Sequence, residues 1–276
     1  MTIMVRSVLV AVFLLFGFLP AIAQSPAPPS WVQGLHSRVR LISGGLEGGQ
    51  GLVGIEIALD PGFKTYWRTP GDSGIPPSFD WSGSDNVAAA EVRWPAPTRH
   101  EDAAGVSYVY GGAVVLPVLV RLKEPGKPVR LSLSMNYGIC NDICIPAQAE
   151  LTAELSQDGP HRSVIEAALA AVPRPQPLGA KEEPAVVEVE RLTPQDKPSF
   201  AVTVRVPEGA RPTLFAEGPE NWYFSTSQAD AGNRFTLTVE DMPKTVSGPV
   251  PVRLTLVAGD NAVETEVNLD AGRQPR

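Results

Sequence analysis

Apolar and polar residues alternate along most of the chain, which is the pattern of β-strands with one buried and one exposed face. The longest alternating run covers residues 129–139. Shorter runs cover residues 53–59, 114–122 and 147–155. Several such strands, separated by turn residues, predict an antiparallel sandwich of immunoglobulin-like size in the first half of the chain.

The alternation is interrupted once and then resumes. Residues 161–172 follow helical spacing between Pro160 and Pro173, which predicts a short helix. The stretch over 173–184 is rich in proline and charge, as is typical of a linker. Alternation then returns and predicts a second sandwich, with strands around residues 200–206, 235–239, 250–256 and 263–269.

The N-terminus has the features of a secretory signal peptide. Arg6 precedes an apolar run over residues 8–19, and Ala21-Ile22-Ala23 supplies a small-x-small cleavage pattern. A membrane-spanning helix needs roughly 20 apolar residues, so an uncleaved anchor is the less favoured alternative. We therefore expect cleavage after Ala23 and export of a chain that does not itself span the membrane, into an oxidising compartment.

The patterns together predict an all-β protein of two immunoglobulin-like β-sandwich domains, joined by a short helix and a Pro-rich linker and preceded by a signal peptide. The expected segments are the signal peptide, a flexible leader, the first sandwich, the helix with its linker, and the second sandwich, over residues 1–23, 24–34, 35–157, 158–184 and 185–272.

Composition agrees with this plan and excludes other classes of protein. Of the 276 residues 43% are hydrophobic, too many for a disordered chain, and the 25 Gly and 28 Pro suit strands joined by turns. The net charge of −7 argues against a nucleic-acid partner, which would require a basic surface.

The candidate chemistry lies at the two cysteines, Cys140 and Cys144, between the two strongest alternating runs. They should occupy a hairpin tip or adjacent strand ends, close enough to form a disulfide if the backbone turns. Closing so short a loop stabilises a fold by only about 2 kcal/mol, and a strained short loop makes a more reducible bond. The spacing alone leaves a redox-active and a structural disulfide equally open. A metal site is less favoured, because it would need His36, His100 or His161 to converge, and we expect no metal and no cofactor.

Three segments carry a resemblance to a known family. They read GFKTYWRTPGDSGIPP over 62–77, WPAPTRHED over 94–102 and YGICNDICIPAQAEL over 137–151. In this order they resemble the periplasmic N-terminal domain of the thiol:disulfide interchange protein DsbD, and still more its ScsB-type relatives. The second sandwich resembles the extra immunoglobulin-like module of ScsB-type proteins, without a sharp motif.

The resemblance implies a periplasmic carrier of reducing equivalents. Such a domain receives electrons from a membrane-embedded partner through a thioredoxin-like domain, and passes them to periplasmic oxidoreductases through mixed disulfides. Carried over residue by residue, Cys144 matches the attacking cysteine and Cys140 the resolving one.

The resemblance also implies a cap loop over the cysteines, formed here by His100, Glu101 and Asp102. The acidic pair Glu101 and Asp102 would disfavour a nearby thiolate and raise the pKa of its thiol. Tyr108 and Tyr137 are candidate walls of the site, although each fits a core aromatic as well.

The chain departs from the family pattern in three respects. Three residues separate the cysteines rather than five, Ala103 and Ala104 stand where the family has an aromatic lid, and neither a transmembrane region nor a thioredoxin motif follows. The expected partners are therefore thioredoxin-like periplasmic oxidoreductases and a separate membrane electron transporter, unless transfer runs in another direction or does not occur.

Two functions remain open from the sequence. The first is thiol–disulfide exchange through Cys140 and Cys144, as a component of protein-disulfide reduction. The second is a non-enzymatic binding or assembly module of two immunoglobulin-like domains, one of them pinned by a structural disulfide. The sequence alone does not decide whether the protein is an enzyme.

Overall fold

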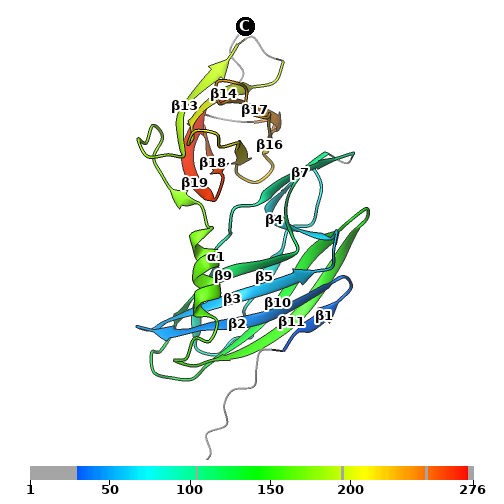
Figure 1. Cartoon of the computed structure of the whole chain (residues 1–276), viewed down its shortest axis with the longest axis vertical. Coiled ribbons are helices and arrows are strands. Elements are labelled where there is room, and N and C mark those ends of the chain that lie inside the picture. The colour runs from blue at the N-terminus through cyan, green and yellow to red at the C-terminus, as the bar shows by residue number, and fades with distance from the viewer. Residues whose placement is uncertain (1–29, 104, 194–195, 246–247, 273–276) are drawn as a thin grey trace, which may run out of the picture.

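The computed structural model describes residues 30–103, 105–193, 196–245 and 248–272. Nineteen strands and one helix form two β-sandwiches over this part of the chain, which confirms the all-β prediction (Figure 1). The expected signal peptide and the expected leader up to residue 29 lie outside the described residues. No helix in the described ranges is long and apolar enough to cross a membrane.

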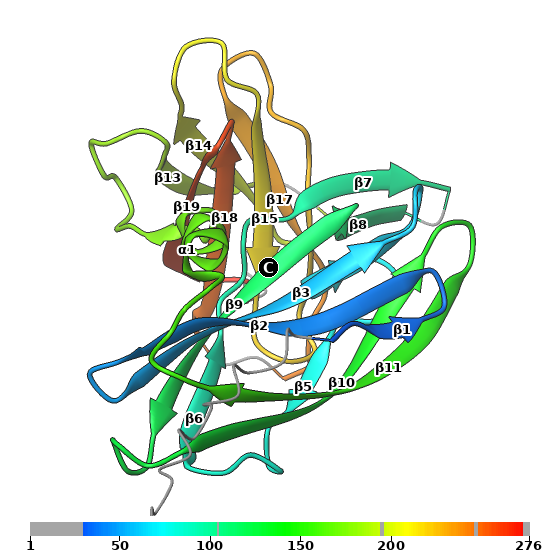
Figure 2. The same ribbon diagram turned by 60° about the horizontal axis from the view of Figure 1, so that its bottom comes forward.

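The first sandwich consists of two antiparallel sheets (Figure 2). One sheet has the order β1 (Val32–Gly34), β2 (Ser37–Glu47), β3 (Gln50–Leu59), β9 (Ala113–Leu122) and β6 (Val87–Val92). The other has the order β11 (Cys144–Leu155), β10 (Val129–Cys140), β4 (Lys64–Gly71), β8 (Gly105–Gly111) and β7 (Thr98–Asp102), with β5 (Ser78–Asp80) also paired to β10.

The alternating apolar residues of both sheets meet between the layers. Inward-facing side chains that are almost completely buried include Ile55, Trp67, Leu116, Leu131, Leu133, Tyr137 and Ile139. Burial of this continuous apolar surface is the main force that holds the two sheets together. The sheet with β10 and β11 is the one that carries the cysteines.

The predicted helix is confirmed as α1 (Arg162–Ala170), which packs on the outer face of the first sheet. Its buried residue Ile165 lies over Gly54 of β3, where an added Cβ would come within 3.1 Å of the Ile165 side chain. The glycine therefore makes room for the helix, and α1 is part of the first sandwich rather than a free connection.

Two short strands correct the expected leader and linker. Residues Val32–Gly34 of the expected flexible leader form β1 and pair with β2, because Val32 continues the register opposite Val39. Residues Arg174–Pro175 of the expected linker form β12 and run parallel to β19. The linker is therefore tied to the second sandwich by backbone hydrogen bonds at its beginning.

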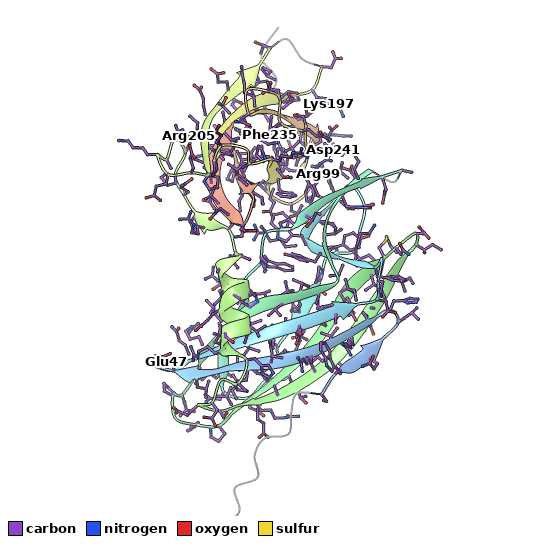
Figure 3. The ribbon with its side chains drawn as sticks, viewed as in Figure 1. Glu47, Arg99, Lys197, Arg205, Phe235 and Asp241 are labelled. Atoms are coloured by element: carbon purple, nitrogen blue, oxygen red, sulfur yellow. A yellow bond between two sulfur atoms is a disulfide. The ribbon has the colours of Figure 1, made fainter. Side chains whose placement is uncertain are left out.

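The second sandwich also has two sheets. One has the order β12, β19 (Asn261–Leu269), β18 (Val250–Ala258) and β15 (Pro212–Glu217). The other has the order β13 (Ala185–Leu192), β14 (Ser199–Arg205), β17 (Arg234–Asp241) and β16 (Tyr223–Thr226). Phe235 points into the core between these sheets (Figure 3).

Candidate redox site

Cys140 and Cys144 close the tip of the β10–β11 hairpin. The two strands pair in continuous register from Val129 opposite Leu155 to Cys140 opposite Cys144. The cysteines form a disulfide, with their Cα atoms 4.2 Å apart. The expectation of a hairpin tip is therefore confirmed, and the strongest alternating pattern of the sequence is what aligns the two sulfur atoms.

The two cysteines differ in exposure. Cys144 is exposed, whereas Cys140 is only 9% exposed and joins a small buried cluster with Tyr66 and Val109. A thiol or disulfide of another protein can therefore reach the sulfur of Cys144 more readily than that of Cys140. This is the asymmetry expected of an attacking and a resolving cysteine.

The disulfide lies on the outer face of its sheet. Along β10, Tyr137 and Ile139 point into the core, so Cys140 points outward because side chains alternate between faces. β4 pairs with β10 so that Lys64 stands directly opposite Cys140. Side chains of directly opposed residues lie on the same face, which places the ammonium group of Lys64 on the cysteine side of the sheet.

Tyr66, two residues after Lys64, contacts the exposed cysteine. Its hydroxyl oxygen lies 2.9 Å from the Sγ atom of Cys144. Burial, and then the negative charge of Asp102, raise the pKa of Tyr66. The hydroxyl therefore stays protonated at neutral pH and is able to donate a hydrogen bond to the sulfur.

A glycine in the following loop holds the Tyr66 ring in place. Gly74 has φ +139°, and a Cβ at this position would come within 2.4 Å of the ring. Ile75 next to it packs against Gly138 of β10. The loop after β4 thus covers Tyr66 closely, and only a residue without a side chain fits at position 74.

The predicted cap residues lie in β7 and are divided between its two faces. His100 and Asp102 alternate with Glu101, so they share the outer face with Lys64. The Nε2 atom of His100 is 2.8 Å from Nζ of Lys64 and 3.2 Å from Oδ2 of Asp102. These contacts bring His100 and Asp102 to the cysteine side of the sheet.

Glu101 departs from the prediction that both acidic residues cover the cysteines. It points to the opposite face of β7, where its carboxylate pairs with Arg99 at 2.5 Å. The sequence prediction treated this segment as a loop, and a loop does not impose alternation. In a strand, two consecutive acidic residues cannot both face the disulfide.

Tyr108 and Tyr137 are not walls of the site. Both side chains belong to the buried core on the inner face of the sheet. Tyr137 shares a hydrogen bond of 2.8 Å with the Ser37 hydroxyl, and Tyr108 lies against Trp67. The sequence prediction missed Lys64 and Tyr66, although both lie within the motif over 62–77.

The three histidines lie at separate places. His36 pairs with Asp60 and stacks on Phe63, whereas His161 stands at the beginning of α1. Within the described ranges no group of three His, Cys, Asp or Glu side chains is placed to hold a metal ion.

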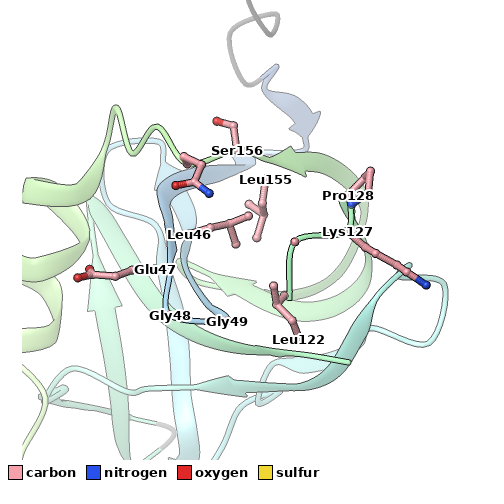
Figure 4. A pocket seen from close by; sticks show the side chains of 11 residues that line it. Leu46, Glu47, Gly48, Gly49, Leu122, Lys127, Pro128, Leu155 and Ser156 are labelled. Carbon is pink, nitrogen blue, oxygen red and sulfur yellow. The ribbon is translucent and has the colours of Figure 1, made fainter. Parts of the chain in front are cut away.

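A cavity of about 420 Å³ lies at the other end of the β10–β11 hairpin, away from the cysteines (Figure 4). Leu46, Leu122 and Leu155 line it, and Glu47 and Lys127 stand at its edge. No cysteine or histidine lines this cavity.

Comparisons with known proteins relate the sandwich that carries both cysteines to a known family. Residues 39–156 match the family model described as thiol:disulfide interchange protein DsbD, N-terminal. A search of curated proteins found no match. Among solved structures, the N-terminal periplasmic domain of ScsB from Proteus mirabilis aligns with a TM-score of 0.71 at 19% identity, over 90% of this chain and 100% of that one.

A second structural match is weak. Tandem Ig repeats of Dlar align over 87% of this chain and 97% of that one, at 10% identity and a TM-score of 0.20, too low to support an argument. The ScsB match shows that this chain shares the fold of that domain. Residues 39–156, which include both cysteines, Lys64 and Tyr66, form a domain of the DsbD N-terminal type.

Proposed function

Because residues 39–156 form a domain of the DsbD N-terminal type, we propose that the chain is a periplasmic thiol–disulfide exchange protein. In this role the Cys140–Cys144 pair cycles between dithiol and disulfide. The observation that supports this most directly is the asymmetry of the pair: Cys144 is exposed beside the Tyr66 hydroxyl, whereas Cys140 is buried behind it.

Exchange proceeds in two balanced steps. The Cys144 thiolate attacks a disulfide of the client, the client S–S bond breaks, and its departing sulfur takes up a proton. Cys140 then loses its proton and attacks Sγ of Cys144, which releases the second client sulfur. The client gains two electrons, and the Cys140–Cys144 disulfide is formed. A reduced thioredoxin-like protein restores the dithiol by the reverse sequence.

Some neighbouring side chains stabilise the thiolate of Cys144 and others destabilise it. A hydrogen bond from Tyr66 stabilises the thiolate, as does the positive charge of Lys64. The carboxylate of Asp102 disfavours the Cys144 thiolate, and Asp102 contacts His100 on the cysteine side of the sheet. The stability of the Cys144 thiolate therefore depends on a hydrogen-bond donor, Tyr66, a cation, Lys64, and an anion, Asp102.

The proposed location is the periplasm, reached through the predicted signal peptide. The proposed partners are thioredoxin-like periplasmic oxidoreductases, together with a separate membrane electron transporter as the source of electrons. An alternative is a binding or assembly module in which the same disulfide is only structural. The two differ in whether the disulfide exchanges with other proteins.

Trapping a mixed disulfide tests the proposal. In Cys140→Ser the resolving thiol is absent, so a thioredoxin-like oxidoreductase should accumulate as an adduct through Cys144. The matched control Cys144→Ser retains only the buried thiol and should form little adduct.

Failure of both variants to form an adduct would contradict the proposal. So would a reduction potential of the wild-type disulfide below about −300 mV, together with resistance to thioredoxin-like proteins. Either result would favour the structural alternative.

A further inference from the structure

The two sandwiches share a buried contact that involves β4, the strand that carries Tyr66. Phe215 of β15 in the second sandwich is completely buried within the core cluster of the first. Its ring centroid is 4.8 Å from that of Tyr108 and 5.7 Å from that of Trp67. The second sandwich therefore packs directly against the core of the first and is not connected to it by the linker alone.

An ion-pair network surrounds this aromatic contact. Arg68 of β4 donates from Nε and Nη2 to the two carboxylate oxygens of Glu217, at 2.8 and 2.6 Å, and from Nη2 to Glu264 at 2.9 Å. Thr69 donates to Glu217 as well, at 2.7 Å. The side chains of Arg68, Glu217 and Glu264 are only 21%, 11% and 17% exposed.

The geometry of this network is that of a strong contact. A guanidinium bound by two parallel hydrogen bonds to one carboxylate has a fixed orientation. Burial by itself lowers the pKa of Arg68, but the hydrogen bonds and charges of Glu217 and Glu264 raise it overall. Removing Arg68 would leave the partly buried carboxylate of Glu217 without this cation, which is costly, whereas Glu264 would keep its ion pair with Arg253 at 3.1 Å.

Three consecutive residues of β4 connect this contact to the cysteines. Tyr66 contacts Sγ of Cys144, Trp67 packs on Phe215, and Arg68 binds Glu217. A strand is extended, so displacement of one residue moves its neighbours along the chain. The position of the Tyr66 hydroxyl is therefore tied to the docking of the second sandwich.

The β7–β8 hairpin is held by the second sandwich in the same way. Tyr108 of β8 contacts Phe215 of β15, with their ring centroids 4.8 Å apart. The neighbouring strand β7 carries His100 and Asp102 at the cysteine face. β4, which pairs with β10, and β8, which pairs with β4, thus both contact the second sandwich through Phe215.

We propose that the second sandwich acts as a support for the redox site, with Arg68 as the positioning residue that holds β4, and with it Tyr66, in place beside Cys144. This inference deepens the proposed exchange function and rests on it. It assigns the second sandwich a role in setting the reactivity of the cysteine pair, beyond that of an attached module.

The test compares Arg68→Met with Arg40→Met. Arg40 is a close match, because it forms a 2.6 Å ion pair with Glu56, is 23% exposed and stacks on Trp31 as Arg68 stacks on Trp67. It lies on β2, in the other sheet. The measurements are the alkylation rate of Cys144 at pH 7 in the reduced protein and the equilibrium of the pair with glutathione.

We expect Arg68→Met to slow alkylation of Cys144 and to shift the glutathione equilibrium toward the disulfide, each by about threefold, whereas Arg40→Met changes neither. Arg68→Lys keeps the positive charge, so both measurements should lie between those of the wild type and those of Arg68→Met. In a Tyr66→Phe background, Arg68→Met should add nothing further, because both changes remove the same hydrogen bond.

Equal results for Arg68→Met and Arg40→Met, or full additivity with Tyr66→Phe, would overturn the inference. If Arg68→Met does not fold, Glu264→Gln provides the test, because it removes one carboxylate and keeps the Glu217 contact. It should shift both measurements in the same direction by a smaller factor, and no shift would count against the inference.

These measurements require no client protein. A wild-type chain that fails to exchange with thioredoxin-like proteins would contradict the proposed function but would leave the comparison of Arg68 and Arg40 intact. The two failures are therefore distinguishable.

Discussion

At the scale of single residues, the reactivity of the cysteine pair depends on a few side chains around Cys144. The sulfur is accessible to a partner, and the Tyr66 hydroxyl is 2.9 Å away. Lys64 contributes a positive charge from the residue opposite Cys140, and Asp102 contributes a negative one. Each of these contributions can be removed separately by a conservative substitution.

Removal of the Tyr66 hydroxyl should make the thiolate of Cys144 less stable. We expect Tyr66→Phe to raise the pKa of the Cys144 thiol and to slow its alkylation at pH 7 by about tenfold, because a hydrogen bond to a charged group contributes about 1.5 kcal/mol or more. The rate is measured with iodoacetamide on reduced protein over a range of pH. Tyr223→Phe is the control, because Tyr223 is 59% exposed and lies in the second sandwich; equal rates in both variants would exclude the role of Tyr66.

The two acidic residues of β7 should differ in effect. Asp102→Asn is expected to accelerate alkylation of Cys144 about twofold, because it removes a negative charge from the cysteine face. Glu101→Gln should change the rate less, because Glu101 points to the other face and pairs with Arg99. High salt should reduce the Asp102 effect by screening. A larger effect of Glu101→Gln would contradict the arrangement of the two faces.

At the scale of elements, the β10–β11 hairpin holds the cysteines together without needing their bond. Its register is continuous from Val129 to Cys140, and β4 and β5 pair with β10 along its other edge. The backbone pairing and the buried inner face of β10 therefore fix the hairpin. This makes a cycle of oxidation and reduction compatible with a stable fold.

Reduction of the disulfide should cost little stability. A loop this short contributes about 2 kcal/mol in the chain-entropy model, so the reduced protein is expected to remain folded. Urea unfolding with and without dithiothreitol measures the difference, and near-ultraviolet circular dichroism reports the aromatic core. Loss of the native spectrum on reduction would mark the disulfide as a structural one.

At the scale of the whole molecule, the two sandwiches behave as parts of one packed body at their contact. Phe215 belongs by sequence to the second sandwich and by packing to the core of the first. Arg68 and its two carboxylate partners surround it. The stability of the cysteine-bearing sheet should therefore depend on a residue far away in the sequence.

Phe215→Ala tests this dependence against Phe235→Ala. Both rings are buried, so each substitution should cost about 3–5 kcal/mol. In a Cys144→Ser background Cys140 is the only thiol, and its alkylation reports opening of the first sandwich. We expect faster alkylation in Phe215→Ala than in Phe235→Ala, whose ring lies inside the second core (Figure 3). Equal rates would show that the two cores open as one.

The buried tyrosines predict a loss of stability at high pH. Burial raises the pKa of Tyr66, Tyr108, Tyr110 and Tyr137 above the usual 10.0. Below pH 10 these phenols are neutral in both states, whereas above it the unfolded chain releases protons that the folded chain keeps. The free energy of unfolding should therefore fall as pH rises above 10. Urea unfolding at several pH values measures this, and Tyr110→Phe should make the dependence weaker.

The sequence by itself predicted the clearly alternating strands, the helix α1 and the placement of both cysteines at a hairpin tip or at adjacent strand ends, but it treated β7 as a loop. These features depend on local patterns: side chains alternate with period two in a strand and turn residues interrupt the pattern, so neighbouring segments of the chain suffice to predict them. The motif over 62–77 also carried part of the family resemblance, but the sequence assigned no role at the site to its individual residues.

Only the tertiary structure decided which side chains meet the disulfide. Strand order places β4 next to β10 and brings Tyr66 and Lys64 to the cysteines, while Tyr108 and Tyr137 face the core. The docking of Phe215 likewise joins parts of the chain that are distant in sequence. Such contacts follow from the burial of apolar surface shared by remote segments, and no local pattern of hydrophobic and polar residues encodes which segments will share it.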